Sequence, residues 1–195
     1  MPPKAEVTRE MIMNAAFELV REAGLEMLTT RRIAQRLRCS TQPIYSVCGS
    51  MEEIRKSVFE RITECVRVYM TEYNDSHKSA ALNLALGFMQ FAQKEKHLFR
   101  ALYLTGYLQY NSDKDMLLGG YILGAEARDQ AFRSGSRIHK LSADSKKNVL
   151  MKLSIYLIGI GTMLNTNAMQ LEMDEIAKMV TEMYEMLLKN EGKLE

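Results

Sequence analysis

The sequence has few of the residues that break helices or cross-link chains. Its 195 residues include only 3 prolines and 3 cysteines, against 15 methionines. Scarce proline, together with many leucines, alanines and glutamates, favours an all-α chain, because these residues are strong helix formers. Hydrophobic residues make up 47% and charged residues 26%, which excludes collagen-like and wholly disordered classes. We expect one large domain, or one small domain joined to a larger one.

The sequence also lacks an excess of charge. Lys and Arg number 26 and Asp and Glu number 24, so the net charge is +2. This balance excludes a uniformly basic coat for nucleic acid, although it allows a local basic patch. No apolar stretch follows the N-terminus, so we expect no secretory signal and a cytoplasmic location. The most apolar run, residues 149–164, contains Lys152 and is shorter than a membrane-spanning helix, which favours a buried helix.

Motifs for metal binding and catalysis are missing as well. Cys39, Cys48 and Cys65 form no C-x-x-C pair and have no histidine at ligand spacing, so we predict reduced thiols and no metal site. Residues 119–124 have the glycine spacing of a phosphate loop but lack the lysine and serine or threonine that follow it. Because no nucleophile elbow or evident pair of carboxylates is present, we expect neither an enzyme nor a cofactor.

The first fifty residues contain the start and stop signals of three short helices. Thr8 can cap a helix that ends at Gly24, and Thr29 or Thr30 can cap a second helix that ends at Leu37. These signals predict two helices, joined by a connector at 25–28.

A third short helix follows a three-residue break. Ser40 is its expected N-cap, Pro43 stands in its first turn, and Gly49 ends it. Residues 50–53 then have the serine-to-glutamate spacing of a capping box, which predicts the start of a long helix.

The rest of the chain is also predicted to be helical, with segments at 80–94, 95–104 and about 113–134 before two long closing helices. Each closing helix has an apolar stripe with steps of three and four residues. The stripes are Leu150, Leu153, Leu157, Ile160 and Leu164, and then Ile176, Val180, Met183 and Leu187. With Gly159 and Gly161 allowing close approach, they favour a homodimer through a four-helix bundle. The alternative is that both stripes are used inside one chain.

Two short helices joined by a turn of three or four residues form a helix-turn-helix arrangement. The N-terminus of the second helix then meets DNA, where Gln42 can bond an adenine edge and Thr41 a thymine methyl. Four arginines and no acidic residue lie between positions 28 and 48, although charge alone would equally fit a solvated helix face. The predicted DNA contacts include Arg31, Arg32, Arg38, Ser40, Thr41, Gln42, Tyr45 and Ser46.

Four stretches stand in a characteristic order: AAFELV at 15–20, LTTRRIA at 28–34, STQPIY at 40–45 and GSMEEI at 49–54. Together they resemble the N-terminal domain of the tetracycline-repressor (TetR) family. The resemblance implies an all-α chain with a helix-turn-helix DNA-binding domain, which we place at 1–49. A larger ligand-binding and dimerisation domain would then occupy 50–195. It also implies a homodimeric regulator, usually a repressor, that binds a palindromic operator and is released by a small ligand.

The resemblance also implies which residues lie at or near DNA. These are the positions Thr29, Arg31, Ser40, Thr41, Gln42 and Tyr45. Two departures from the family pattern affect the same region. Ser46-Val47-Cys48 replaces the common His-Tyr-Phe, and Met51 replaces a common lysine. Loss of a phosphate-contacting cation is expected to lower both the affinity for DNA and its salt dependence.

Aromatic residues gather in the middle of the chain. They favour an apolar pocket for an apolar or aromatic ligand, whereas the alternative for each ring is ordinary core packing. The predicted ligand-binding residues are Phe88, Phe91, Phe99, Tyr103, Tyr107 and Tyr121. The departures near the recognition helix leave a second function open, which is a ligand-binding or interaction protein of the same fold with weakened or lost DNA binding.

Overall fold

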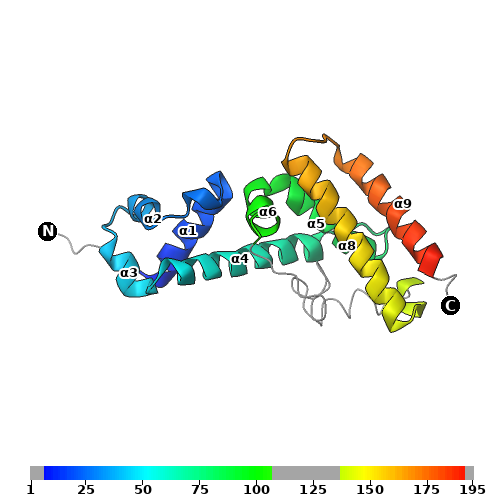
Figure 1. The fold of residues 1–195 in the computed structure, drawn as a ribbon, viewed down its shortest axis with the longest axis horizontal. Coiled ribbons are helices and arrows are strands. Elements are labelled where there is room, and N and C mark those ends of the chain that lie inside the picture. The colour runs from blue at the N-terminus through cyan, green and yellow to red at the C-terminus, as the bar shows by residue number, and fades with distance from the viewer. Residues whose placement is uncertain (1–6, 107–136, 192–195) are drawn as a thin grey trace. The chain divides into compact units, whose positions relative to one another are not determined.

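The computed structural model describes residues 7–106 and 137–191. All regular structure in these ranges is helical, which confirms the all-α prediction (Figure 1). The first range contains α1 (Arg9–Ala23), the 3-10 turn η1 (Leu25–Met27), α2 (Thr30–Leu37), α3 (Gln42–Cys48), α4 (Met51–Glu72), α5 (Ala80–Lys94) and α6 (Lys96–Tyr103). The second contains the 3-10 turn η2 (Arg137–Lys140), α8 (Ala143–Asn165) and α9 (Met173–Glu191). The helix predicted at about 113–134 lies outside the described residues.

The chain packs as two compact units. Among the described residues, the first unit comprises 7–64 and 95–106, and the second comprises 65–94 and 137–191. The first unit therefore holds α1, α2, α3, the N-terminal part of α4, and α6. The boundary between the two compact units falls within α4, between Glu64 and Cys65. The domain boundary predicted from the sequence, between residues 49 and 50, instead separates the predicted DNA-binding domain from the predicted ligand-binding and dimerisation domain. That boundary stays a prediction.

The first unit is organised around α1. The Thr8 hydroxyl accepts the Met11 N–H at 3.3 Å, and the helix ends at Gly24, whose φ is 98°. Both predicted end signals of this helix are confirmed. Ile12 and Val20 are fully buried, so one face of α1 forms the core against α2 and α6.

The second unit depends on a close approach between backbones. Gly87 of α5 lies so near the α4 backbone that an added Cβ would overlap the Tyr69 carbonyl oxygen. No side chain fits there, since real Cβ atoms do not come within 3.0 Å of other atoms. Next to this contact, Phe88 and Met89 are fully buried.

Helix α8 is a core helix of the second unit. By length and composition alone it is apolar enough to cross a membrane, with a mean hydropathy of 1.2. It packs, however, against both α5 and α9 (Figure 1). The buried Asn165 amide donates hydrogen bonds to the carbonyl oxygens of Ala92, at 2.9 Å, and Gly161, at 2.8 Å. These bonds tie the C-terminal end of α8 to α5.

The apolar stripes of α8 and α9 are largely buried within a single chain. Six of their members are buried in the second unit: Leu153, Leu157, Ile160, Ile176, Val180 and Leu187. The expectation that these six form a dimer contact is therefore wrong, because the core of the protomer already covers them. Other apolar side chains of the two helices remain on the surface, with Ile155 59% exposed, Met163 41% and Met186 47%.

Candidate nucleic-acid interface

Local hydrogen bonds define both ends of α2. The Thr29 hydroxyl accepts the Arg32 N–H at 3.3 Å, which confirms Thr29 as one of the two predicted caps. At the other end Arg38 takes the left-handed conformation, with φ 52° and ψ 42°, and its N–H bonds back to α2. This conformation turns the chain sharply toward α3, although a residue with a side chain adopts it rarely.

Helix α3 begins one residue later than predicted. The N-cap is Thr41 and not Ser40, and the cap side chain makes no hydrogen bond. Pro43 lies in the first turn as expected, where a missing N–H leaves no helical bond unmade. Gly49, with φ 72°, ends the helix, and the Ser50 hydroxyl accepts the Glu53 N–H at 3.2 Å to start α4.

Burial sets which face of α2 and α3 points to solvent. Ile33, Ala34, Ile44 and Cys48 are buried and hold the two helices on the core of the first unit. All nine predicted contact residues, on the two helices and in the turn between them, are exposed. These are Thr29, Arg31, Arg32, Arg38, Ser40, Thr41, Gln42, Tyr45 and Ser46. Their role at DNA stays a prediction.

Two of these hydroxyls already have partners in the protein. The Tyr45 hydroxyl lies 3.0 Å from the Thr30 hydroxyl, which links α3 to the start of α2. The Ser46 hydroxyl donates to the Gln42 carbonyl oxygen at 3.0 Å. Tyr45 is still 49% exposed, so its ring remains on the surface. Sequence reasoning considered Thr30 only as a helix cap and missed this contact, which depends on a side chain fifteen positions away.

The four arginines between positions 28 and 48 differ in whether an ion pair within the protein neutralises them. The Arg36 guanidinium binds both carboxylate oxygens of Glu22, with one N–O distance of 2.8 Å. That pair holds the pKa of the Glu22 carboxyl below its ordinary value. Within the part of the chain that the structure describes, Arg31, Arg32 and Arg38 form no ion pair. The cationic surface therefore consists of three arginines and not four.

Ion pairs also hold the scaffold behind this surface. The Arg21 guanidinium of α1 contacts both carboxylate oxygens of Glu95, at 2.9 and 2.6 Å, and the Glu95 side chain is only 7% exposed. Glu95 precedes α6, so the pair joins α1 to the start of α6. At the other end of α1, Arg9 lies 3.8 Å from the Glu53 carboxylate of α4.

Two cysteines, Cys39 in the turn before α3 and Cys48 at the last position of α3, have different surroundings. Cys48 is buried, and burial raises the pKa of its thiol. A thiol that keeps its proton reacts slowly, which favours a packing role. Cys39 is half-buried in the turn.

The aromatic residues predicted to bind a ligand fall in both units. Phe88 and Phe91 of α5 are fully buried in the second unit, with ring centroids 6.4 Å apart. Phe99 and Tyr103 of α6 belong to the first unit, with ring centroids 5.0 Å apart. The last two members, Tyr107 and Tyr121, lie outside the described residues. Ligand binding by these rings stays a prediction.

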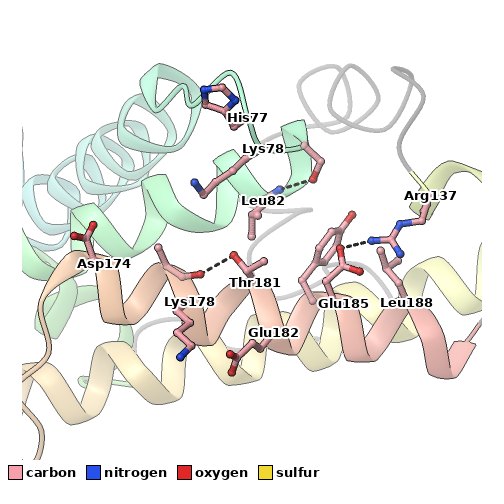
Figure 2. A pocket seen from close by; sticks show the side chains of 13 residues that line it. His77, Lys78, Leu82, Arg137, Asp174, Lys178, Thr181, Glu182, Glu185 and Leu188 are labelled. Atoms are coloured by element: carbon pink, nitrogen blue, oxygen red, sulfur yellow. Dashed lines mark hydrogen bonds and ion pairs between the residues drawn. The ribbon is translucent and has the colours of Figure 1, made fainter.

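A groove that the sequence reasoning missed lies in the second unit. Its volume is about 710 Å³, and side chains from the α4–α5 connection, α5, η2 and α9 line it (Figure 2). None of the six predicted aromatic residues lines this groove. Its residues come from three distant stretches of sequence, so no local pattern could have indicated it. Within residues 7–106 and 137–191, no cluster of three His, Cys, Asp or Glu side chains could hold a metal ion.

Among solved structures, the chain is similar to a TetR-like transcriptional regulator from Rhodococcus sp. RHA1. The TM-score is 0.58, and the match covers 94% of this chain and 96% of that chain. The chain has a TetR-like fold. The sequences are 16% identical, so this likeness concerns the fold. No protein-family model and no curated protein matches the sequence. The TetR-like fold agrees with the resemblance found in the first 54 residues.

Proposed function

We propose that the chain is a DNA-binding transcriptional regulator of the TetR type. The observation that carries the proposal is the exposed surface of α2 and α3, where three arginines form no ion pair with the described residues and the N-terminus of α3 is also exposed. Arginines bind DNA phosphates and guanine edges, and a helix N-terminus attracts phosphate. The TetR-like fold supports the proposal, since the similar solved structure is described as a transcriptional regulator.

We assign recognition of the DNA base sequence to the residues at the start of α3. Gln42 is exposed in the first turn and can bond the N6 and N7 atoms of adenine together. Thr41 beside it offers a hydroxyl and a methyl group. Arg31 and Arg32 at the start of α2 would contact phosphates and fix the register on the duplex.

A homodimer through α8 and α9 is part of the proposal. Ile155, Met163 and Met186 leave apolar surface on these helices after the core is formed. Gly159 is exposed on α8, and no atom lies within 4 Å of the position that its Cβ would take. This open position would let a second copy approach closely. Two-fold pairing presents two α3 helices, which fits a palindromic operator with half-sites about one helical turn apart, or a small multiple of that.

The regulator is proposed to be a cytoplasmic repressor that a small, apolar or aromatic ligand releases from DNA. Such release is a population shift, in which the ligand binds better to a conformation whose α3 helices do not fit the operator. Occupancy of a pocket must then lower operator affinity. An affinity that no pocket-binding compound changes would contradict this part of the proposal.

Selection of bound sequences from a random pool of double-stranded DNA tests the DNA-binding function. The full chain should enrich an inverted repeat. Gln42→Ala should relax the preference at one position of each half-site, which costs about 1–3 kcal/mol of discrimination. Gln170→Ala, an exposed glutamine in the second unit, is the matched control. Absence of enrichment even at low salt would contradict the proposal.

The alternative is a ligand-binding protein of the same fold with weakened or lost DNA binding. Met51 favours it, because a half-buried methionine starts α4 where the TetR pattern has a lysine. Met51→Lys separates the two functions. A regulator should bind DNA more tightly in this variant and gain salt dependence, whereas a chain that does not use DNA should be unaffected.

A further inference from the structure

The hydroxyls of Thr30 and Tyr45 meet where α3 contacts the start of α2. Thr30 is the first residue of α2, Tyr45 lies in the middle of α3, and their oxygens are 3.0 Å apart. Within residues 7–106 and 137–191, this is the only hydrogen bond that the Tyr45 hydroxyl makes. An exposed tyrosine side chain of α3 is therefore tied to the other helix of the pair.

The two hydroxyls together have one proton more than their own bond needs. Each hydroxyl carries one proton and can also accept, so the bond between them uses one proton and leaves the other. The hydroxyl of Ser46, the next residue of α3, differs because it donates its single proton to the Gln42 carbonyl oxygen at 3.0 Å. A DNA phosphate oxygen needs a donor. Of these two hydroxyls of α3, only that of Tyr45 can donate to a phosphate and keep its bond within the protein.

Exposure indicates which of the two oxygens keeps the remaining proton when a phosphate is present. Tyr45 is 49% exposed, whereas Thr30 is half-buried. Tyrosine hydroxyls are among the groups that bind DNA phosphates. With Thr30 as the donor to Tyr45, the Tyr45 proton is free for a phosphate. A hydroxyl that accepts one hydrogen bond also donates the next one more strongly.

We propose that Thr30 is a positioning residue for DNA binding, whose hydroxyl holds the Tyr45 side chain so that the Tyr45 hydroxyl donates to a DNA phosphate. The benefit comes on binding, because a side chain that is already placed loses less conformational freedom when the complex forms. In the free chain water competes for both exposed hydroxyls, so their bond adds little to the stability of the fold. This role rests on the proposed DNA-binding function.

A double-mutant cycle on the full chain tests whether Thr30 acts through Tyr45. Fluorescence anisotropy measures the affinity for the DNA that the parent chain selects. Tyr45→Phe should weaken binding about tenfold and Thr30→Val about threefold. Neither change should alter the salt slope, since neutral hydroxyls displace no counterions. In a chain that already carries Tyr45→Phe, Thr30→Val should cause no further loss.

Two further variants show whether the hydroxyl of Thr30 is the group that matters. Thr30→Ser keeps the hydroxyl and should bind DNA like the parent. Thr71→Val is the matched control, because Thr71 is an exposed threonine of the second unit whose hydroxyl bonds its own helix at the Arg67 carbonyl oxygen. Equal affinity of Thr30→Val and the parent would overturn the proposal. Losses that multiply in the double variant would also overturn it, since Thr30 would then act independently of Tyr45.

NMR of the tyrosine rings tests the positioning in the absence of DNA. The ring signal of Tyr45 is the one that disappears in the Tyr45→Phe variant. This signal should shift in Thr30→Val and keep its place in Thr71→Val. An unchanged Tyr45 signal in Thr30→Val would overturn the positioning role, whether or not the chain binds DNA. A shifted signal in a chain that selects no DNA would instead contradict the regulator and the phosphate contact, while the bond between the two hydroxyls would stand.

Discussion

The helix-turn-helix surface of the first unit and the groove of the second unit depend on the sequence in different ways. The surface comes from one stretch, 29–46, in which caps, turn and side chains are neighbours along the chain. The groove joins the α4–α5 connection, η2 and α9, which are far apart along the chain, from His77 to Leu188. A site whose residues are neighbours along the chain can be predicted from the sequence. A site whose residues are brought together by packing can be identified only once the fold is known.

The packing that builds the second unit gives the largest expected effect. Gly87→Ala should destabilise the chain by about 3 kcal/mol, because the new Cβ would meet the rigid α4 backbone at Tyr69. Gly159→Ala is the matched control and should be neutral or slightly stabilising at protein concentrations where the chain is monomeric, as its Cβ meets no atom of its own chain. Denaturant unfolding of both variants gives the comparison. Equal stability of the two would contradict the close approach of α4 and α5.

The first unit is tested by two arginines that are close in sequence. Arg31→Ala should lower DNA affinity severalfold and reduce the salt slope by about one, because it removes an exposed cation that forms no ion pair with the described residues. Arg36→Ala should change DNA affinity little, since Glu22 already neutralises Arg36. Fluorescence anisotropy with labelled DNA at several salt concentrations measures both. Equal losses would mean that the ion pair opens on DNA.

Left-handed residues offer a smaller test in both units. Arg38→Gly should raise stability by about 0.5–1 kcal/mol, because glycine adopts a φ of 52° without strain, and it should weaken DNA binding through the lost cation. Asn167→Gly in the second unit, at φ 58°, should gain less stability and leave DNA binding unchanged. Thermal unfolding measures the stability of both variants, and fluorescence anisotropy measures their DNA affinity. Stronger DNA binding by the Arg38→Gly variant would show that the Arg38 side chain does not contribute to DNA binding.

The smallest expected effect concerns pH and the pairing of α8 with α9. The Lys152 ammonium, 2.7 Å from the buried Glu191 carboxylate, holds the pKa of Glu191 below its ordinary value. A carboxyl with a lowered pKa stabilises the fold above its ordinary pKa, about 4.3, and this stability is lost as the pH falls through the lowered value. Glu191→Gln should therefore be less stable than the parent at pH 7 and equally stable at low pH. A difference that stays constant with pH would argue against the ion pair.

Much of the first unit could be predicted from sequence because helix ends are local. The Thr8, Thr29 and Ser50 caps and the Gly24 and Gly49 stops each depend on residues within a few positions. The start of α3 was missed by one residue, since Ser40 and Thr41 are both good caps and only the fold selects between them. The pairing of Arg36 with Glu22 was also missed, because it joins two helices.

The second unit was less predictable for a related reason. The apolar stripes of α8 and α9 showed that these helices bury a face, but periodicity does not say whether the partner is the same chain or a second copy. For six of those residues the partner is the protomer's own core. The groove could not be selected by pattern either, because its lining residues come from three distant stretches of sequence.

The most direct test of the central claim is the salt dependence of binding to the DNA that the chain itself selects. The account predicts an enriched inverted repeat, an affinity that falls steeply as salt rises, and a shallower slope when Arg31, Arg32 and Arg38 are replaced together by alanine. Binding that does not depend on salt, or no enriched sequence at low salt, would contradict the assignment of the α2–α3 surface to DNA.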